Sequence, residues 1–260
     1  MLIKGADLLV EGASSAAKKF KVKELIIGLT IVAFGTSAPE MVVNIISSYD
    51  GHDEVVFGNI IGSNIFNLFL ILGVAGVIYP MSVRNNTIWK EIPYSFVITI
   101  VLFILVNDVL ILQADTNGLS RWDGFILLGM FGLFMFYIFK SLKNDNEDPF
   151  VEEAQHLQEL KNSTTIFYVL FGIVGLGFGG KLVVDNAVSV AEHYDVSQKL
   201  IGLTIISIGT SLPELATSIV AAMRKKSDIA LGNVLGSNIF NITLILGISV
   251  FVKPLTYNPQ

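Results

Sequence analysis

One stretch of this chain occurs twice and limits what the chain can fold into: an apolar run that ends in small hydroxyl residues, a proline and an acid. The first copy covers residues 28–40 (GLTIVAFGTSAPE), and the second (GLTIISIGTSLPE) begins at Gly202, 174 residues later. An acid inside an apolar membrane span is costly and marks a functional site. The matched acids, Glu40 and Glu214, therefore predict one site shared by two halves of the chain.

The composition predicts that these runs lie in a membrane. The chain has 260 residues, of which 52% are hydrophobic and 15% charged, and its mean hydropathy is +0.66. A helix needs about 20 apolar residues to cross a bilayer. We expect spans at about 25–47, 55–79, 93–112, 122–140, 165–191, 200–222 and 229–252, after a first span at 1–20 that lacks its opening turns.

A second motif repeats at the same offset. Residues 57–67 (FGNIIGSNIFN) return as 231–241 (LGNVLGSNIFN). The chain thus divides into a first repeat at 1–140, an acidic connector at 141–163 and a second repeat at 164–260. A repeat with an odd number of spans places its second copy in the opposite orientation. The predicted fold is therefore all-α: a polytopic helical membrane protein of two inverted-topology repeats, with about eight helices.

Loop charges support this inversion. Cytoplasmic loops are enriched in lysine and arginine. Residues 18–23 contain four lysines, whereas the equivalent loop at 192–195 is acidic. The loop at 50–54 is acidic, whereas its equivalent, which begins at Arg224, is basic. We expect a cell-membrane protein with its amino terminus outside and its connector in the cytoplasm.

The repeated motif is rich in oxygen ligands. A proline lacks a backbone N–H, so Pro39 and Pro213 free carbonyls near Gly35 and Gly209. Hydroxyl groups and carboxylates follow within about a turn, at Thr36, Ser37, Glu40, Thr210, Ser211 and Glu214. Oxygen ligands suit hard cations such as Ca²⁺, and Na⁺ by extension. The absence of cysteine excludes thiolate metal sites,.

Other interpretations of these motifs remain open. The glycines at 58, 62, 232 and 236 are also typical of helix packing, and Asn64 and Asn238 are suited to bonding one helix to another. Residues 175–180 (GLGFGG) superficially resemble a phosphate loop, but they lie in a span, where close helix packing is expected,. The acids of the connector are typical of a solvated loop.

At these motifs the chain resembles the cation/calcium exchanger superfamily, specifically the prokaryotic sodium/calcium antiporters. Both Gly-Thr-Ser-x-Pro-Glu and Gly-Asn-x-x-Gly-Ser-Asn-Ile-Phe-Asn are similar to the alpha repeats of that family. The resemblance implies two inverted five-helix halves, of which the last two helices are absent here. It also implies a ligand set of Glu40, Thr36, Ser37, Ser63, Asn67 and the Ala33 carbonyl, with Glu214, Thr210, Ser211, Ser237, Asn241 and the Ser207 carbonyl. Some members carry an aspartate where this chain has Asn241.

The leading hypothesis is a secondary antiporter, a monomeric transport unit rather than an enzyme. It exchanges Na⁺ for Ca²⁺ by alternating access and needs no cofactor or nucleic-acid partner. The alternative is H⁺/Ca²⁺ exchange through the same glutamates. An intramembrane hydrolase that uses Glu40 and Glu214 as acid and base, and a membrane scaffold that does not transport, are weaker hypotheses.

Overall fold

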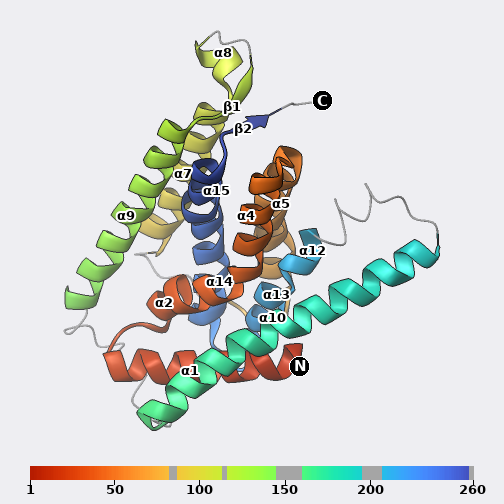
Figure 1. Cartoon of the computed structure of the whole chain (residues 1–260). Helices are drawn as coiled ribbons and strands as arrows, with labels where there is room; N and C mark the ends of the chain where they lie inside the picture. The colour runs from red at the N-terminus through yellow and green to blue at the C-terminus, as the bar shows by residue number, and fades with distance from the viewer. Residues whose placement is uncertain (82–86, 113–115, 145–159, 195–206, 258–260) are drawn as a thin grey trace.

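The structure is a computed structural model that describes residues 1–81, 87–112, 116–144, 160–194 and 207–257, which are mostly helical (Figure 1). The first part comprises α1 (Leu2–Phe20), α2 (Glu24–Ile27), η1 (Gly28–Val32), α3 (Ala33–Thr36), α4 (Ala38–Asp50), α5 (Asp53–Phe66), η2 (Asn67–Ile71), α6 (Leu72–Ile78), η3 (Thr87–Glu91), α7 (Ile92–Val106), α8 (Asp108–Leu112), β1 (Asn117–Leu119) and α9 (Arg121–Asn144). The second comprises α10 (Asn162–His193), α12 (Ser207–Thr210), α13 (Leu212–Met223), α14 (Ser227–Ile239), η8 (Phe240–Ile245), α15 (Leu246–Val252) and β2 (Leu255–Tyr257).

Among the described residues, five continuous helices are long and apolar enough to cross a membrane, and a bent pair adds a sixth span. They confirm the spans expected at 55–79, 122–140, 165–191 and 229–252, and the bent pair, Glu24–Thr36 with Ala38–Asp50, matches 25–47. Helix α1 is not among them, because it carries charges along its length. Residues 200–206 of the seventh expected span and most of the connector lie outside the described residues.

The expectation of one continuous helix over 93–112 is wrong for its last residues. The helix ends at Val106, Asn107 takes a non-helical conformation (φ −96°, ψ 54°), and the short α8 follows. The amide of Asn107 donates to the carbonyl of Phe103 at 2.6 Å, which caps the end of α7. Beyond it, β1 pairs antiparallel with β2, with Asn117 opposite Tyr257. This ladder was not predicted, because three-residue strands show no hydrophobic period.

The repeated motif interrupts its helix in both halves. Ser37 (φ −82°, ψ 5°) and Ser211 (φ −86°, ψ 5°) leave the helical conformation at equivalent positions. Each precedes a helix with proline in its first turn, where the missing N–H costs nothing, and α2–α3 and α4 meet at a bend of 47°. The helix is therefore interrupted where the hydroxyl residues of the motif lie, at the centre of the protein.

A π-helical segment begins at the end of the second motif in each half. It begins at Asn67 in the first half (η2) and at Phe240, next to Asn241, in the second half (η8). The widened turns of π-helices occur frequently at functional sites. The span that contains α14 is 83% buried, against 22–28% for the other continuous spans, so α14 forms the centre of the fold.

Two sets of glycines allow helices to pack closely. On α14, a Cβ at Gly232 would lie 2.6 Å from the Leu25 carbonyl oxygen, and one at Gly236 would lie 2.6 Å from the Ala33 Cβ. Helix packing is therefore confirmed for these two glycines, whereas Gly58 and Gly62 meet no atom within 4 Å among the described residues. The second set, on α10, lies against α1. In Figure 1, α1 lies across one end of the bundle and α10 crosses it obliquely.

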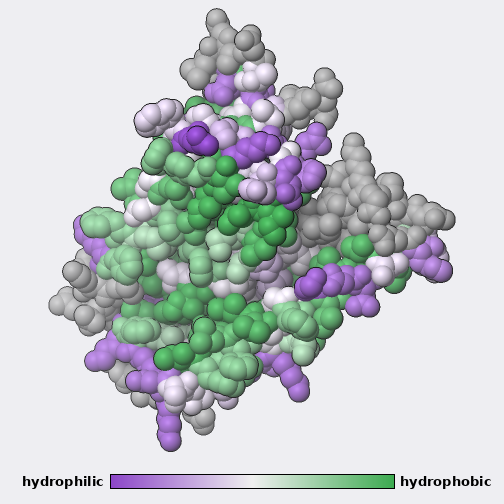
Figure 2. Space-filling view, in the orientation of Figure 1, coloured by the Kyte–Doolittle hydropathy of each residue, from purple (hydrophilic) through white to green (hydrophobic). Residues whose placement is uncertain are grey.

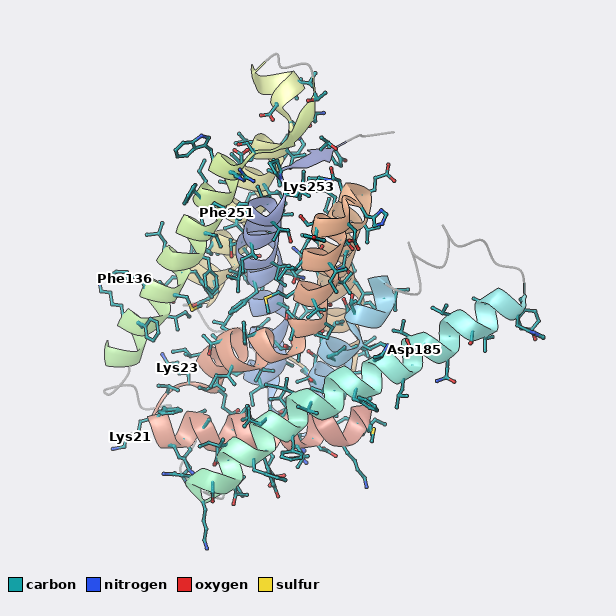
Figure 3. All side chains as sticks on the ribbon, viewed as in Figure 1. Lys21, Lys23, Phe136, Asp185, Phe251 and Lys253 are labelled. Carbon is teal, nitrogen blue, oxygen red and sulfur yellow. The ribbon has the colours of Figure 1, made fainter. Side chains whose placement is uncertain are left out.

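One face of the molecule is polar at its two ends and apolar between them. Figure 2 shows a broad hydrophobic zone bounded by hydrophilic side chains above and below. Figure 3 shows Lys21 and Lys23 at the end of the bundle opposite to Lys253. This distribution is that of a protein whose middle faces lipid.

Candidate cation site

The ten predicted ligand side chains that the structure describes are all buried, each at most 7% exposed. They come from the helix breaks between α3 and α4 and between α12 and α13, and from α5, η2, α14 and η8. The side chain of Ser207 lies outside the described residues; its backbone begins α12. The remaining predicted ligand, the Ala33 carbonyl, already accepts the N–H of Ser37 at 3.0 Å and the hydroxyl of Thr36 at 3.3 Å.

The serines of each helix break hold the glutamate of the other repeat. Ser37 Oγ donates to Glu214 Oε1 at 2.9 Å, and Ser211 Oγ donates to Glu40 Oε1 at 3.0 Å. A serine of the second motif joins each pair: Ser237 Oγ lies 3.0 Å from Ser37 Oγ, and Ser63 Oγ lies 2.9 Å from Ser211 Oγ. The two acids therefore lie in one network that crosses between the repeats.

The threonines reveal two residues that the sequence reasoning missed. Thr36 Oγ1 donates to Asn233 Oδ1 at 2.9 Å, and Thr210 Oγ1 donates to Asn59 Oδ1 at 3.0 Å. Both asparagines are buried. Their signal was present in the sequence, because each is the asparagine of the repeated Gly-Asn pair, but nothing local indicates that its partner lies in the other half.

The asparagines of the second motif also bond across the repeats. Asn67 Nδ2 donates to Asn238 Oδ1 at 2.9 Å, and Asn241 Nδ2 donates to Asn64 Oδ1 at 3.0 Å. The role expected for Asn64 and Asn238, bonding helix to helix, is thus confirmed. Every cross-repeat bond of this network recurs when 174 is added to one residue number and subtracted from the other. The site therefore has an approximate two-fold symmetry that follows the sequence repeat.

Four oxygens of this network have no hydrogen-bond partner within the described residues: Oε2 of Glu40 and of Glu214, and Oδ1 of Asn67 and of Asn241. All four belong to side chains that are 1% exposed. Buried carboxylates are costly unless a positive charge compensates them. Carboxylate, amide and hydroxyl oxygens together form a donor set for a hard cation. In the described part of the chain, no three or more histidine, cysteine, aspartate or glutamate side chains are grouped so that they could hold a metal ion, so two carboxylates supply the charge here.

A buried, oxygen-lined site shared by two related halves of a helical membrane protein is typical of a secondary transporter. The particular family follows from comparison with known proteins: the chain belongs to the sodium/calcium exchanger protein family, whose model matches residues 1–140 and 164–260.

The similarity to individual relatives and to a solved structure supports this family assignment. The sodium/calcium exchanger MaX1 of Methanosarcina acetivorans is 33% identical, over 98% of this chain and 81% of its own length. The solved sodium-calcium exchanger NCX_Mj, soaked with Na⁺ and Sr²⁺, superposes with a TM-score of 0.82 at 32% identity and covers 99% of this chain and 80% of that one. A vacuolar cation/proton exchanger of rice is 24% identical, over 87% of this chain and 54% of its own length.

Proposed function

We propose that this protein expels Ca²⁺ in exchange for Na⁺, and that both ions bind in turn to the oxygens around Glu40 and Glu214. The observation that carries the proposal is the pair of unpartnered carboxylate oxygens, Glu40 Oε2 and Glu214 Oε2, buried at equivalent places in the two repeats. The similarity to exchangers named for sodium and calcium supports this choice of ions.

The ligand set of the proposal is the predicted one. The two carboxylates supply the charge, and the hydroxyls of Thr36, Ser37, Ser63, Thr210, Ser211 and Ser237 and the amide oxygens of Asn67 and Asn241 complete the coordination. The Ala33 carbonyl, which is engaged within its own turn, joins this set when that turn opens, and the Ser207 carbonyl is its equivalent in the second repeat.

Charge balance explains why the two ions exchange. Two carboxylates neutralise one Ca²⁺ or two Na⁺, so either load leaves the site without the cost of an uncompensated buried charge. Both ions need the same oxygens, so binding of one displaces the other. The site opens alternately to the two sides of the membrane as one repeat moves against the other; the repeats are residues 1–140 and 164–260. We place the amino terminus outside the cell membrane and the 141–163 connector in the cytoplasm, in a monomeric transport unit.

The test is uptake of radioactive Ca²⁺ by vesicles that contain the purified chain, loaded with Na⁺ or with matched K⁺. Glu40→Gln and Glu214→Gln should each lower Na⁺-dependent uptake by about 100-fold or more, because removal of one charge from a buried arrangement costs ~3–5 kcal/mol. Asp185→Asn, at an acid on the molecular surface of α10 that pairs with Lys181 at 3.1 Å, is the control and should transport normally. Normal uptake by both glutamine variants would refute the site.

The second candidate is exchange of Ca²⁺ for H⁺, which the similarity to a cation/proton exchanger favours. Protonation of the same two glutamates would release the ion. The vesicle assay separates the candidates when each load is measured with and without a pH gradient. Uptake that requires internal Na⁺ supports the Na⁺ exchanger, whereas uptake driven by the pH gradient alone replaces it by the proton exchanger.

A further inference from the structure

Two asparagines outside the proposed ligand set hold the amide of a proposed ligand in the opposite repeat. Asn238 Oδ1 accepts Asn67 Nδ2 at 2.9 Å, and Asn64 Oδ1 accepts Asn241 Nδ2 at 3.0 Å. An amide group carries its oxygen and its NH₂ on opposite sides. Each bond therefore engages the NH₂ group and leaves the oxygen of Asn67 or Asn241 without a partner among the described residues.

We propose that Asn64 and Asn238 are positioning residues, which fix the amides of Asn241 and Asn67 so that each presents its oxygen to the bound cation. This inference rests on the ligand set of the proposed function. Without the cross-repeat bond, an amide can turn over and present its NH₂ group, whose partial positive charge repels a cation. The orientation of one amide thus decides whether the position attracts or repels the ion.

The two positioning residues are themselves fixed in orientation. Asn64 Nδ2 donates to the Asn238 backbone carbonyl, and Asn238 Nδ2 donates to the Asn64 backbone carbonyl, each at 3.4 Å. If either amide turned over, its oxygen would face a carbonyl oxygen and its NH₂ group would face the NH₂ group of its partner. Both changes are unfavourable in a buried site. The four amides consequently form two pairs, Asn67 with Asn238 and Asn241 with Asn64, and each pair is held by a backbone carbonyl rather than by a side chain of the other pair.

The arrangement also makes each repeat dependent on the other for its ligand. Helix α5 supplies Asn64, which orients Asn241 of η8, and α14 supplies Asn238, which orients Asn67 of η2. A substitution at Asn238 should therefore act through Asn67, in the other half of the chain. It should not act through Asn241, although Asn241 lies only three residues away along the sequence.

Double-mutant cycles test this crossed dependence. Asn238→Leu keeps the volume of the side chain and removes its hydrogen bonds, and Asn67→Ala removes the ligand. The full chain in vesicles is assayed for the KM of Ca²⁺ uptake, and the thermal unfolding of each variant is measured without Ca²⁺. Asn238→Leu should raise the KM by about tenfold, the loss expected for a contact to a charged group.

The decisive comparison is between backgrounds. In the Asn67→Ala background, Asn238→Leu should leave the KM nearly unchanged, whereas in the Asn241→Ala background it should again raise the KM by about tenfold. Asn64→Leu repeats the test with the two backgrounds interchanged, and it replaces the first cycle if Asn238→Leu does not fold. A residue with only a structural role would lower the unfolding temperature equally in both backgrounds and would show no crossed pattern in the KM.

The outcomes separate this inference from the function on which it rests. If Asn67→Ala and Asn241→Ala raise the KM but Asn238→Leu multiplies the KM equally in both backgrounds, the positioning role is refuted and the ligand set stands. If Asn67→Ala and Asn241→Ala leave the KM unchanged, the ligand set is wrong at these positions, and the positioning role is overturned with it.

Discussion

The packing of α1 against α10 leads to a quantitative prediction about glycine. A Cβ added at Gly172 on α10 would lie 2.7 Å from the backbone nitrogen of Leu9 and 2.9 Å from its Cα. Ordinary van der Waals contact begins near 3.4 Å. Because the obstructing atoms are backbone atoms, no rotamer change relieves the clash, and Gly172→Ala must push the two helices apart by several tenths of an ångström.

A second glycine on the same helix provides the control. A Cβ at Gly177 meets no atom within 4 Å among the described residues. Both substitutions gain up to about 1 kcal/mol of helix propensity, so this gain cancels in the comparison. The remaining steric cost of overpacking is about 1–3 kcal/mol. Gly172→Ala should therefore have a Tm several degrees below that of Gly177→Ala, at about 2–4 °C per kcal/mol.

The assay is thermal unfolding of the two purified variants in the same detergent. Gly5→Ala extends it, because a Cβ at Gly5 would lie 2.8 Å from the Leu176 backbone nitrogen at the same interface. Once one substitution has separated the helices, the second costs less, so Gly5→Ala and Gly172→Ala together should lower the Tm by less than the sum of the single effects. Equal Tm values for Gly172→Ala and Gly177→Ala would show that α1 and α10 are not in backbone contact.

Three further predictions concern other parts of the molecule. Tyr137→Phe removes the hydroxyl that donates to Glu91 Oε1 and leaves a carboxylate that is 4% exposed without this partner; we expect a loss of about 1–3 kcal/mol in the free energy of unfolding, and an unchanged Tm would contradict it. Gly118→Ala should separate β1 from β2, because its Cβ would collide with the Leu255 carbonyl oxygen, and faster hydrogen exchange in that ladder would detect the separation. Asn241→Asp should add a third carboxylate to the site and strengthen binding of Na⁺ relative to Ca²⁺, since three charges balance three monovalent ions; an unchanged Na⁺ dependence of Ca²⁺ uptake would exclude a ligand role for this position.

Much of the fold could be predicted from the sequence because membrane helices are a local property. The apolar runs identify the spans at 55–79, 122–140 and 165–191, and the structure confirms them. The sequence also predicted that the helix is disrupted near Gly35 and Gly209, because a proline inside an apolar run cannot continue the helix that precedes it; the structure has the breaks at Ser37 and Ser211. The end of α7 at Asn107 was not predicted, because hydropathy continues past the residue where the helix stops.

The residues of the candidate site likewise include some that the sequence predicted and some that it did not. The repeat identified Glu40 and Glu214 as a matched pair, because an acid in an apolar run is conspicuous in any sequence. It did not identify Asn59 and Asn233 as partners of the threonines, since asparagine in a span is compatible with several roles. Their role depends on residues 151 and 197 positions away along the chain.

The sequence by itself determined that the chain spans a membrane, that it is built from two related halves and that each half contributes one acid to a common site. These properties follow from hydropathy, from the repeat and from the cost of a buried charge, all of which are written in the residues themselves. Only the tertiary structure decided that Ser37 holds Glu214 and that Ser211 holds Glu40. The reason is physical: a hydrogen bond forms only when the distance between donor and acceptor is correct to within a few tenths of an ångström. The packing of one helix against another sets that distance.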